Sequence, residues 1–231
     1  MSTRRVVAAI ALMALFVGAA APSDLKVTAK YPEKPTGTMH YAEAITLAVG
    51  DAKPLVLDGE MLPIPGPHLR LADSRFLLLG WSSPGSGMQS MHVLLIAVRD
   101  AAVVVDGQMV VMTDRPSAGL LVRVTPRSAR IGLPQPPSDF VHDEEEWFLN
   151  LGGGRSLNLE QMRKLVFARV HPRKDDLFYN EPVSAAPMPK RVAWIDVTPN
   201  GFALAASPRI NKSLWSRSTN ETRRGYRFVE P

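Results

Sequence analysis

Glycine and proline interrupt this chain so often that long helices have little room to form. The 231 residues include 20 prolines and 16 glycines, which separate short runs of aliphatic and β-branched residues. Runs of this kind, bounded by turn-forming residues, are typical of β-strands joined by tight connections. Because 45% of the residues are hydrophobic, the chain can also bury a substantial core. The sequence therefore predicts a folded, mainly β protein.

Three dipeptides indicate hairpin turns. Asp58-Gly59, Asp106-Gly107 and Asn200-Gly201 each lie between apolar runs. Aspartate or asparagine followed by glycine accepts the positive φ angles of a type I′ turn, whose twist suits two antiparallel strands. We therefore expect a hairpin at each of these positions.

The apolar runs also predict where the strands lie. Met91 to Val98 and Ala101 to Val105 are apolar on both faces, so these strands should be covered twice, between two packed sheets or beneath a helix. Pro63, Pro65 and Pro67 predict a stiff extended connection. We expect strands at residues 25–31, 41–49, 75–81, 91–98, 101–105, 108–113, 119–125, 129–133, 191–197 and 202–207.

One short helix is predicted from about Leu159 to Val166. Asn158 can cap its N-terminus together with Gln161 three residues later. Leu157 and Met162 occupy the two positions of a hydrophobic staple. The predicted fold class is thus mainly β, an antiparallel β-sandwich or meander-type sheet with one short helix.

The first residues resemble a secretory signal peptide. Arg4 and Arg5 precede the uncharged run Val6 to Ala21, which ends in small residues. An uncleaved membrane anchor is the alternative, because the run falls just short of the usual spanning length. The predicted organisation is a signal peptide at residues 1–20, a β-rich domain at 21–207 and a basic polar tail at 208–231.

Composition limits the compartment and the partners. The chain contains no cysteine, which excludes thiol catalysis, thiolate metal sites and lipid attachment at a processed N-terminus. Abundant alanine, valine, arginine and proline favour a bacterial envelope protein, either periplasmic or secreted. The net charge of +5 is too small to predict nucleic-acid binding. Membrane contact is expected only through the N-terminal segment or the basic tail, which is otherwise a solvated terminus.

A loop after a predicted apolar strand is the first candidate for ligand contact, because loops on rigid β scaffolds often carry function. This loop, Gly80 to Ser90, lacks the G-x-S-x-G nucleophile pattern, since Pro84 stands at the second glycine position. Its predicted ligand-binding residues are Trp81, Ser82, Ser83, Ser86 and Gln89.

The acidic stretch from Pro137 to Phe148 supplies three further candidate ligand-binding residues, Asp139, His142 and Asp143. Its consecutive carboxylates do not follow the alternating pattern of a calcium loop. We interpret the stretch as a solvated loop leading into a buried strand, with a metal or acid/base cluster as the alternative.

The remaining polar residues carry no catalytic signature. The five histidines are scattered, and the H-E-x-x-H pattern of zinc hydrolases is missing. His92 lies within an apolar strand and is interpreted as a hydrogen-bonded core residue. Gly152 to Gly154 lack the spacing and lysine of a phosphate loop and predict a strand-to-helix turn. No catalytic residue, metal ligand or cofactor is predicted.

The function expected from the sequence is non-catalytic. The leading hypothesis is an exported envelope domain that binds an unknown protein or small ligand through its loops. The alternative is a hydrolase-like or metal-dependent enzyme using Asp139, His142 and Asp143, or a serine of the Gly80 to Ser90 loop. A third hypothesis is a structural envelope component tethered by an uncleaved N-terminus and the basic tail.

Overall fold

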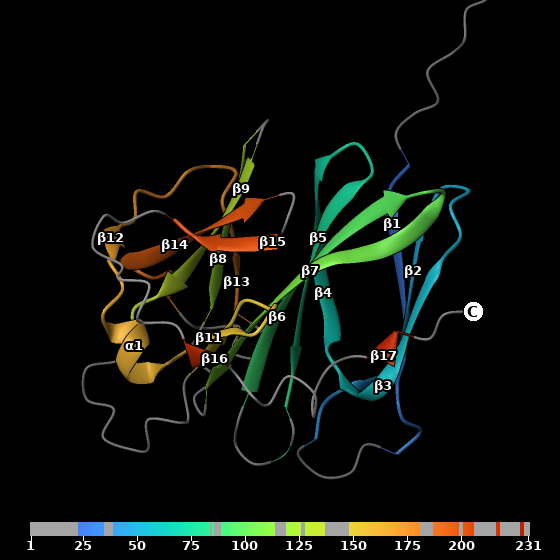
Figure 1. Ribbon diagram of the computed structural model, residues 1–231, viewed down its shortest axis with the longest axis horizontal. Coiled ribbons are helices and arrows are strands. Elements are labelled where there is room, and N and C mark those ends of the chain that lie inside the picture. Colours follow the sequence, from blue (N-terminus) through green and yellow to red (C-terminus); the bar gives the residue numbers. More distant parts are fainter. Residues whose placement is uncertain are drawn as a thin grey trace, which may run out of the picture.

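The part of the chain that the structure describes forms three antiparallel β-sheets and one short helix (Figure 1). The computed structural model describes residues 23–34, 39–83, 85, 89–113, 119–125, 128–136, 148–180, 187–198, 201–205, 216–217 and 227–228. The prediction of a mainly β chain with one short helix is confirmed. None of the helical structure in these ranges is long and apolar enough to cross a membrane.

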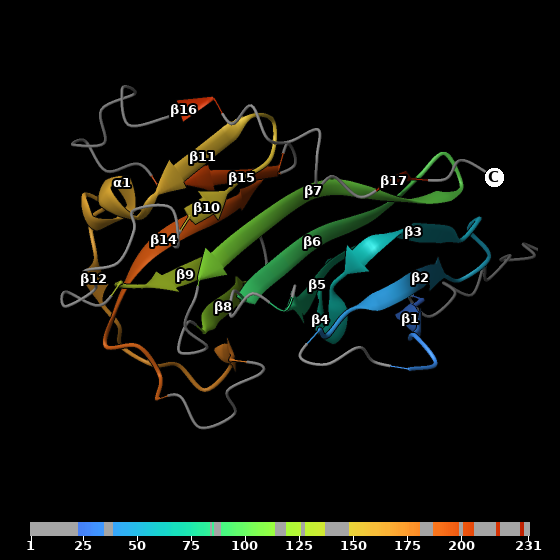
Figure 2. The same ribbon diagram turned by 90° about the horizontal axis from the view of Figure 1, so that it is seen from below.

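The central sheet has seven strands in the order β16-β11-β10-β7-β6-β5-β4. Its β6–β7 hairpin is long and runs between the other two sheets (Figure 2). The strands are β4 (Ile64–Ala72), β5 (Arg75–Ser82), β6 (Gln89–Arg99), β7 (Ala102–Thr113), β10 (Phe148–Asn150), β11 (Arg155–Asn158) and β16 (Ser216–Arg217).

Two smaller sheets pack on opposite faces of the central sheet. The N-terminal sheet comprises β1 (Leu25–Lys30), β2 (Ala42–Val49), β3 (Leu55–Leu62) and β17 (Arg227–Phe228). The C-terminal sheet has the order β12-β14-β9-β8-β13, with β15 also paired to β14. Its strands are β8 (Leu120–Thr125), β9 (Ser128–Pro134), β12 (Ala168–Arg169), β13 (Leu177–Tyr179), β14 (Arg191–Thr198) and β15 (Gly201–Leu204).

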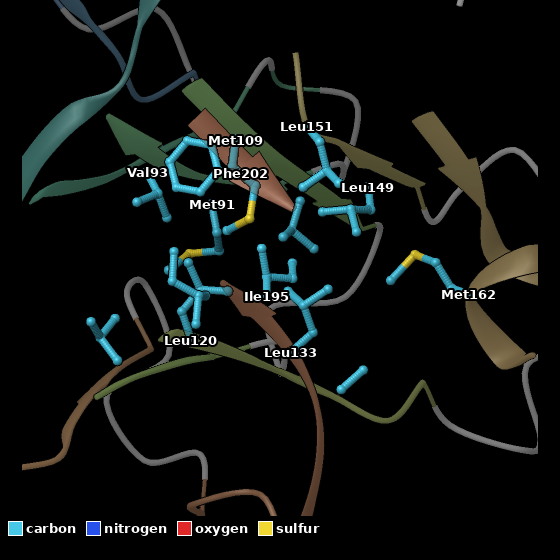
Figure 3. Close-up of a cluster of buried hydrophobic side chains, with 14 of the residues drawn as sticks. Met91, Val93, Met109, Leu120, Leu133, Leu149, Leu151, Met162, Ile195 and Phe202 are labelled. Atoms are coloured by element: carbon cyan, nitrogen blue, oxygen red, sulfur yellow. The ribbon is translucent and has the colours of Figure 1, made fainter. Parts of the chain in front are cut away.

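Side-chain alternation along the central strands builds two cores at once. In β6, Met91 and Val93 belong to the core beneath the C-terminal sheet, whereas Leu94 and Ile96 belong to the core beneath the N-terminal sheet. Figure 3 shows Met91 and Val93 in the same cluster of buried side chains as Ile195 of the C-terminal sheet. The expectation that this apolar run is buried on both faces is confirmed.

The hairpin predicted at Asp106-Gly107 is wrong, because β7 continues through both residues. Leu95 pairs with Gly107 and Ile96 with Val105, so Asp106 is the extra residue of a β-bulge. The chain reverses instead at Asp100-Ala101, where both φ angles are positive, at 49° and 60°. Backbone hydrogen bonds from the segment at Lys53 to this turn help to hold it in place.

The bulge allows β7 to serve both cores. Val103, before the bulge, contacts the N-terminal core, whereas Met109 and Val111, after it, contact the C-terminal core. All three numbers are odd, so strict alternation would have placed them on one face. One inserted residue reverses the faces of the strand.

A close approach between sheets leaves little space for a side chain at Gly107. A Cβ atom at this position would lie 3.1 Å from Gly201 Cα and 3.4 Å from Phe202 Cε2. We expect Gly107→Ala to lower the free energy of unfolding by about 1–3 kcal/mol through overpacking, measured by urea denaturation. The matched control is Gln108→Ala on the same strand, for which a change within about 0.5 kcal/mol is expected. Equal effects of the two substitutions would contradict this role for Gly107.

The hairpin predicted at Asp58-Gly59 is also wrong. Ala44 pairs with Asp58 and Ala42 with Leu62, so residues 59–61 lie opposite Glu43 as an irregularity within β3. Gly59 has a φ angle of 159° and Met61 one of 57°. The positive φ of Met61 marks this departure from regular strand geometry.

A hairpin does form at the third predicted position, but Gly201 lies in β15 opposite Thr198 of β14 and not in the two-residue turn. The prediction of a proline-rich connection is wrong, because Pro65 and Pro67 lie in β4, which is an edge strand with an irregular register. Edge strands and bulges tolerate proline, since one side of the backbone needs no hydrogen bond.

The helix α1 (Leu159–Arg163) is shorter than predicted, but its cap is confirmed. Gln161 N donates to Asn158 Oδ1, and Asn158 N donates to Gln161 Oε1, each at 2.9 Å. The buried side chain of Met162 anchors the helix to the C-terminal core.

Two short segments of the basic tail pair with sheet edges. In β16, Ser216 lies opposite Ser156, and in β17, Phe228 lies opposite Leu57. The tail therefore reaches both the central and the N-terminal sheets.

Candidate functional site

The predicted ligand loop starts at the end of β5, where side chains differ in their exposure. Trp81 and Gln89 are partly exposed, whereas Ser82 and Ser83 are buried. Ser86 lies outside the described residues. A ligand at this rim would therefore meet Trp81 and Gln89 before either buried serine.

Ser82 and His92 form a buried polar pair between β5 and β6. The register places Ser82 opposite Ser90 and Gly80 opposite His92, so both side chains lie on the face toward the N-terminal sheet. Ser82 Oγ and His92 Nε2 are 3.0 Å apart and form a hydrogen bond. The two residues are 6% and 7% exposed. The interpretation of His92 as a hydrogen-bonded core residue is confirmed.

Burial lowers the pKa of His92 from 6.5 to about 3. Removing the imidazole from water penalises its charged form, and the Ser82 hydroxyl offers no compensating negative charge. His92 is therefore neutral throughout the physiological pH range.

The distance between Ser82 Oγ and His92 Nε2 is that of a catalytic serine and its base, but this is the only feature the pair shares with such a site. A catalytic serine needs space beside its oxygen for a substrate carbonyl. The hollow beside His92 is lined by Gly80 and by apolar residues including Ile45 and Leu94, and it leaves no room for a water molecule. This geometry favours a structural hydrogen bond that satisfies two buried polar groups.

A second contact closes the rim beside the pair. His40 and Ser83 exchange backbone hydrogen bonds of 3.0 Å in both directions. The rings of His40 and Trp81 lie 5.4 Å apart and are tilted by 43°. The segment before β2 is thereby fixed to the end of β5.

The acidic candidates Asp139, His142 and Asp143 lie outside the described residues, so they stay a prediction. Within the described ranges, no group of three histidine, aspartate or glutamate side chains is arranged to hold a metal ion.

Gly152 to Gly154 form a strand-to-strand connection, and the predicted strand-to-helix turn is wrong. β10 and β11 pair as a hairpin with Asn150 opposite Ser156. All three glycines have positive φ angles of 60–73°. Arg155 donates to the carbonyl of Phe202 at 2.9 Å, and this contact holds the hairpin to β15.

A groove of about 340 Å³ opens at one end of the C-terminal sheet, where β8 and β14 begin and β9 ends. We call it the proline groove, because Pro134, Pro187 and Pro189 form much of its wall. Phe178 of β13 lies against Gly119, where a Cβ atom would stand 2.3 Å from the ring. A larger residue at position 119 would therefore require the Phe178 ring to move.

The groove lining also includes three polar residues. Gln135, Lys190 and Arg191 contribute the hydrogen-bonding and charged side chains. Arg191 is anchored by donating from Nε and Nη2 to the carbonyl of Phe167, at 3.0 and 2.7 Å. Lys190 is exposed. No described carboxylate forms an ion pair with either cation.

Sequence reasoning did not find the proline groove. Its wall comes from four segments that are separated in sequence, namely 119, 134–135, 178 and 187–191. A local motif cannot signal such a site, although Phe178 and the prolines at 187 and 189 could have been noted as a biased cluster.

Comparison of the chain with protein-family models, with curated proteins and with solved structures finds no match in any of the three.

Proposed function

We propose that this chain is an exported, non-catalytic binding domain of the bacterial cell envelope, and that the proline groove is its ligand site. The observation that carries the proposal is that the groove with room for a ligand and the pair of side chains that could act in catalysis lie at different places. The groove offers about 340 Å³, within the range of small-ligand sites. Its described lining contains no histidine, serine, aspartate or glutamate to act as a base or nucleophile.

The Ser82–His92 pair has the opposite character. It brings a hydroxyl and an imidazole together, and the hollow beside His92 has no room for a water molecule. A serine hydrolase would need both features at one place. A binding role for the groove therefore agrees better with the arrangement of these residues.

The signal-like N-terminal sequence supports export. We expect mass spectrometry of the native protein from an envelope fraction to give a chain beginning at Ala21. An intact chain recovered from the cytosol would contradict this part of the proposal.

Binding is tested by thermal unfolding of the native protein with three probes of equal chain length: decanol, decanoate and decylammonium. At ten times its dissociation constant, a bound probe stabilises the fold by about 1.4 kcal/mol. For a chain of this size that corresponds to a rise in Tm of roughly 3–6 °C. At least one probe should produce this shift.

A groove-filling variant provides the control. Gln135 is exposed and lines the groove, so Gln135→Trp should remove the shift, whereas Asp51→Trp at an exposed turn of the N-terminal sheet should retain it. No shift with any probe would exclude the groove as a site for such ligands. Labelling of the wild type by a fluorophosphonate that is lost in Ser82→Ala would instead favour the hydrolase.

A further inference from the structure

We infer that the proline groove selects a small amphiphilic carboxylate, with an apolar body and a single anionic group. The inference rests on the proposed function, because it assigns a ligand class to the same groove. Three features of the groove carry it: the sign of its charge, the chemistry of its wall and its size.

The charge of the lining favours an anion. Lys190 and Arg191 are adjacent in the chain and both line the groove, and none of its eight described lining residues is acidic. Arg191 is held in place by the carbonyl of Phe167, so its position does not depend on a ligand. A carboxylate gains attraction here, whereas an ammonium group is repelled.

The wall favours an apolar body without peptide groups. Pro134, Pro187 and Pro189 have no backbone N–H, so the wall offers few donors for pairing with a bound peptide strand. Phe178 and the prolines offer apolar surface instead. Aliphatic or aromatic carbon can bury against this surface and leave no hydrogen bond unsatisfied.

The size of the groove favours a small molecule. Its 340 Å³ corresponds to roughly ten water molecules at the volume each occupies in the liquid. A medium-chain carboxylate is in this range, whereas a folded protein partner would contact a much wider surface.

Calorimetric titration with the same three probes tests the ligand class. Decanoate is expected to bind roughly tenfold more tightly than decanol, through charged hydrogen bonds that decanol makes only as a neutral group. Decylammonium should bind most weakly. Binding of decanol as tight as that of decanoate would overturn this inference and leave the proposed function standing, whereas failure of all three probes would remove both.

Lys190 provides the decisive variant, because it is exposed and its removal should not disturb the fold. Lys190→Gln is expected to weaken decanoate binding about three- to fivefold and to leave decanol unchanged. The matched control is Lys26→Gln, an exposed lysine of β1 in the N-terminal sheet, which should change neither affinity. Equal losses for decanoate and decanol in Lys190→Gln would overturn the role of charge.

Titration with a peptide distinguishes the two possible sources of an apolar carboxylate, a free small molecule and the C-terminus of a protein. A hexapeptide ending in leucine with a free carboxylate should bind more weakly than decanoate, because the proline wall cannot pair with its backbone. Tighter binding of this peptide would overturn the small-molecule assignment in favour of a protein C-terminus.

Discussion

Replacing Arg123 with methionine is expected to lower the free energy of unfolding by about 3–5 kcal/mol. Arg123 of β8 donates from Nε to Asp176 Oδ1 and from Nη2 to Asp176 Oδ2, each at 2.8 Å. The side chain of Asp176 is only 1% exposed. Methionine keeps the apolar stem but leaves the buried carboxylate without its counter-charge. Urea unfolding of the wild type and the variant measures the loss.

The ion pair holds a segment across the outer face of the C-terminal sheet. Arg123 Nη2 also donates to the carbonyl of His171 at 3.2 Å, and Arg173 N donates to Asp176 Oδ2 at 2.9 Å. The guanidinium carbon of Arg123 lies 4.8 Å from the ring centre of Trp194. The outer cluster formed by Leu121, Val170 and Val192 therefore depends on the position of this segment.

Arg130 offers a matched control, because it lies directly opposite Arg123 in the β8–β9 register. Its ion pair with Asp196 is 51% and 34% exposed, so Arg130→Met should cost less than about 1 kcal/mol. Adding Asp176→Leu to Arg123→Met should recover much of the loss, since no buried charge would remain. A loss in Arg123→Met no larger than that in Arg130→Met would contradict the buried-pair interpretation.

Local chemistry in the sequence was sufficient to predict most strands and the helix cap. The run from Met91 to Val98 is apolar at nearly every position, as expected for a strand covered on both faces. Asn158 and Gln161 form their cap from contacts within four residues. Features of this kind depend on neighbours in the chain, which a sequence displays directly.

The aspartate-glycine errors arose because the same residues serve distant contacts. Asp106 accepts hydrogen bonds from Arg75 and Arg99, at 3.1 and 2.7 Å, and Gly107 makes room for Gly201 of another sheet. A type I′ turn needs aspartate and glycine for their backbone angles. Here, the carboxylate of Asp106 is needed for its hydrogen bonds, and Gly107 is needed because it has no side chain. Only the packing of sheets distinguishes the two cases.

The candidate site shows the same limit. Ser82 was predicted to contact a ligand because it follows an apolar strand, but its partner His92 and its burial follow from the register of β5 and β6. The proline groove depends on the order of strands in the C-terminal sheet, which brings residue 119 beside residue 178. Strand order results from long-range pairing that hydrophobic patterns alone do not specify.

The second large effect expected is a loss of stability in mild acid that depends on His92. Its pKa is about 3 in the folded protein and 6.5 as the ordinary value. Above pH 6.5 the imidazole is neutral in both states, and the full stability is present. As the pH falls below 6.5, His92 binds a proton in the unfolded chain but stays neutral in the folded chain. The free energy of unfolding should therefore fall by about 1.4 kcal/mol per pH unit until the pH reaches about 3.

The carboxylate of Asp176 acts in a different pH window. Arg123 lowers the pKa of Asp176 below its ordinary value of 3.8. The contribution of the Asp176 carboxylate to the free energy of unfolding is therefore complete above pH 3.8. It is lost only as the pH falls through the lowered pKa of the folded protein. Measurements between pH 6 and 4.5 consequently separate the histidine from this carboxylate.

Substitution of His92 tests both its titration and its role. His92→Gln keeps a polar side chain near Ser82 but cannot bind a proton, so its stability should change little between pH 6 and 4.5. The exposed His171 provides the control, and His171→Gln should retain the steep dependence of the wild type. Equal slopes for the wild type and His92→Gln would show that the imidazole is not excluded from water. If the slope disappears while probe binding at the proline groove is unchanged, His92 stabilises the fold without taking part in ligand binding.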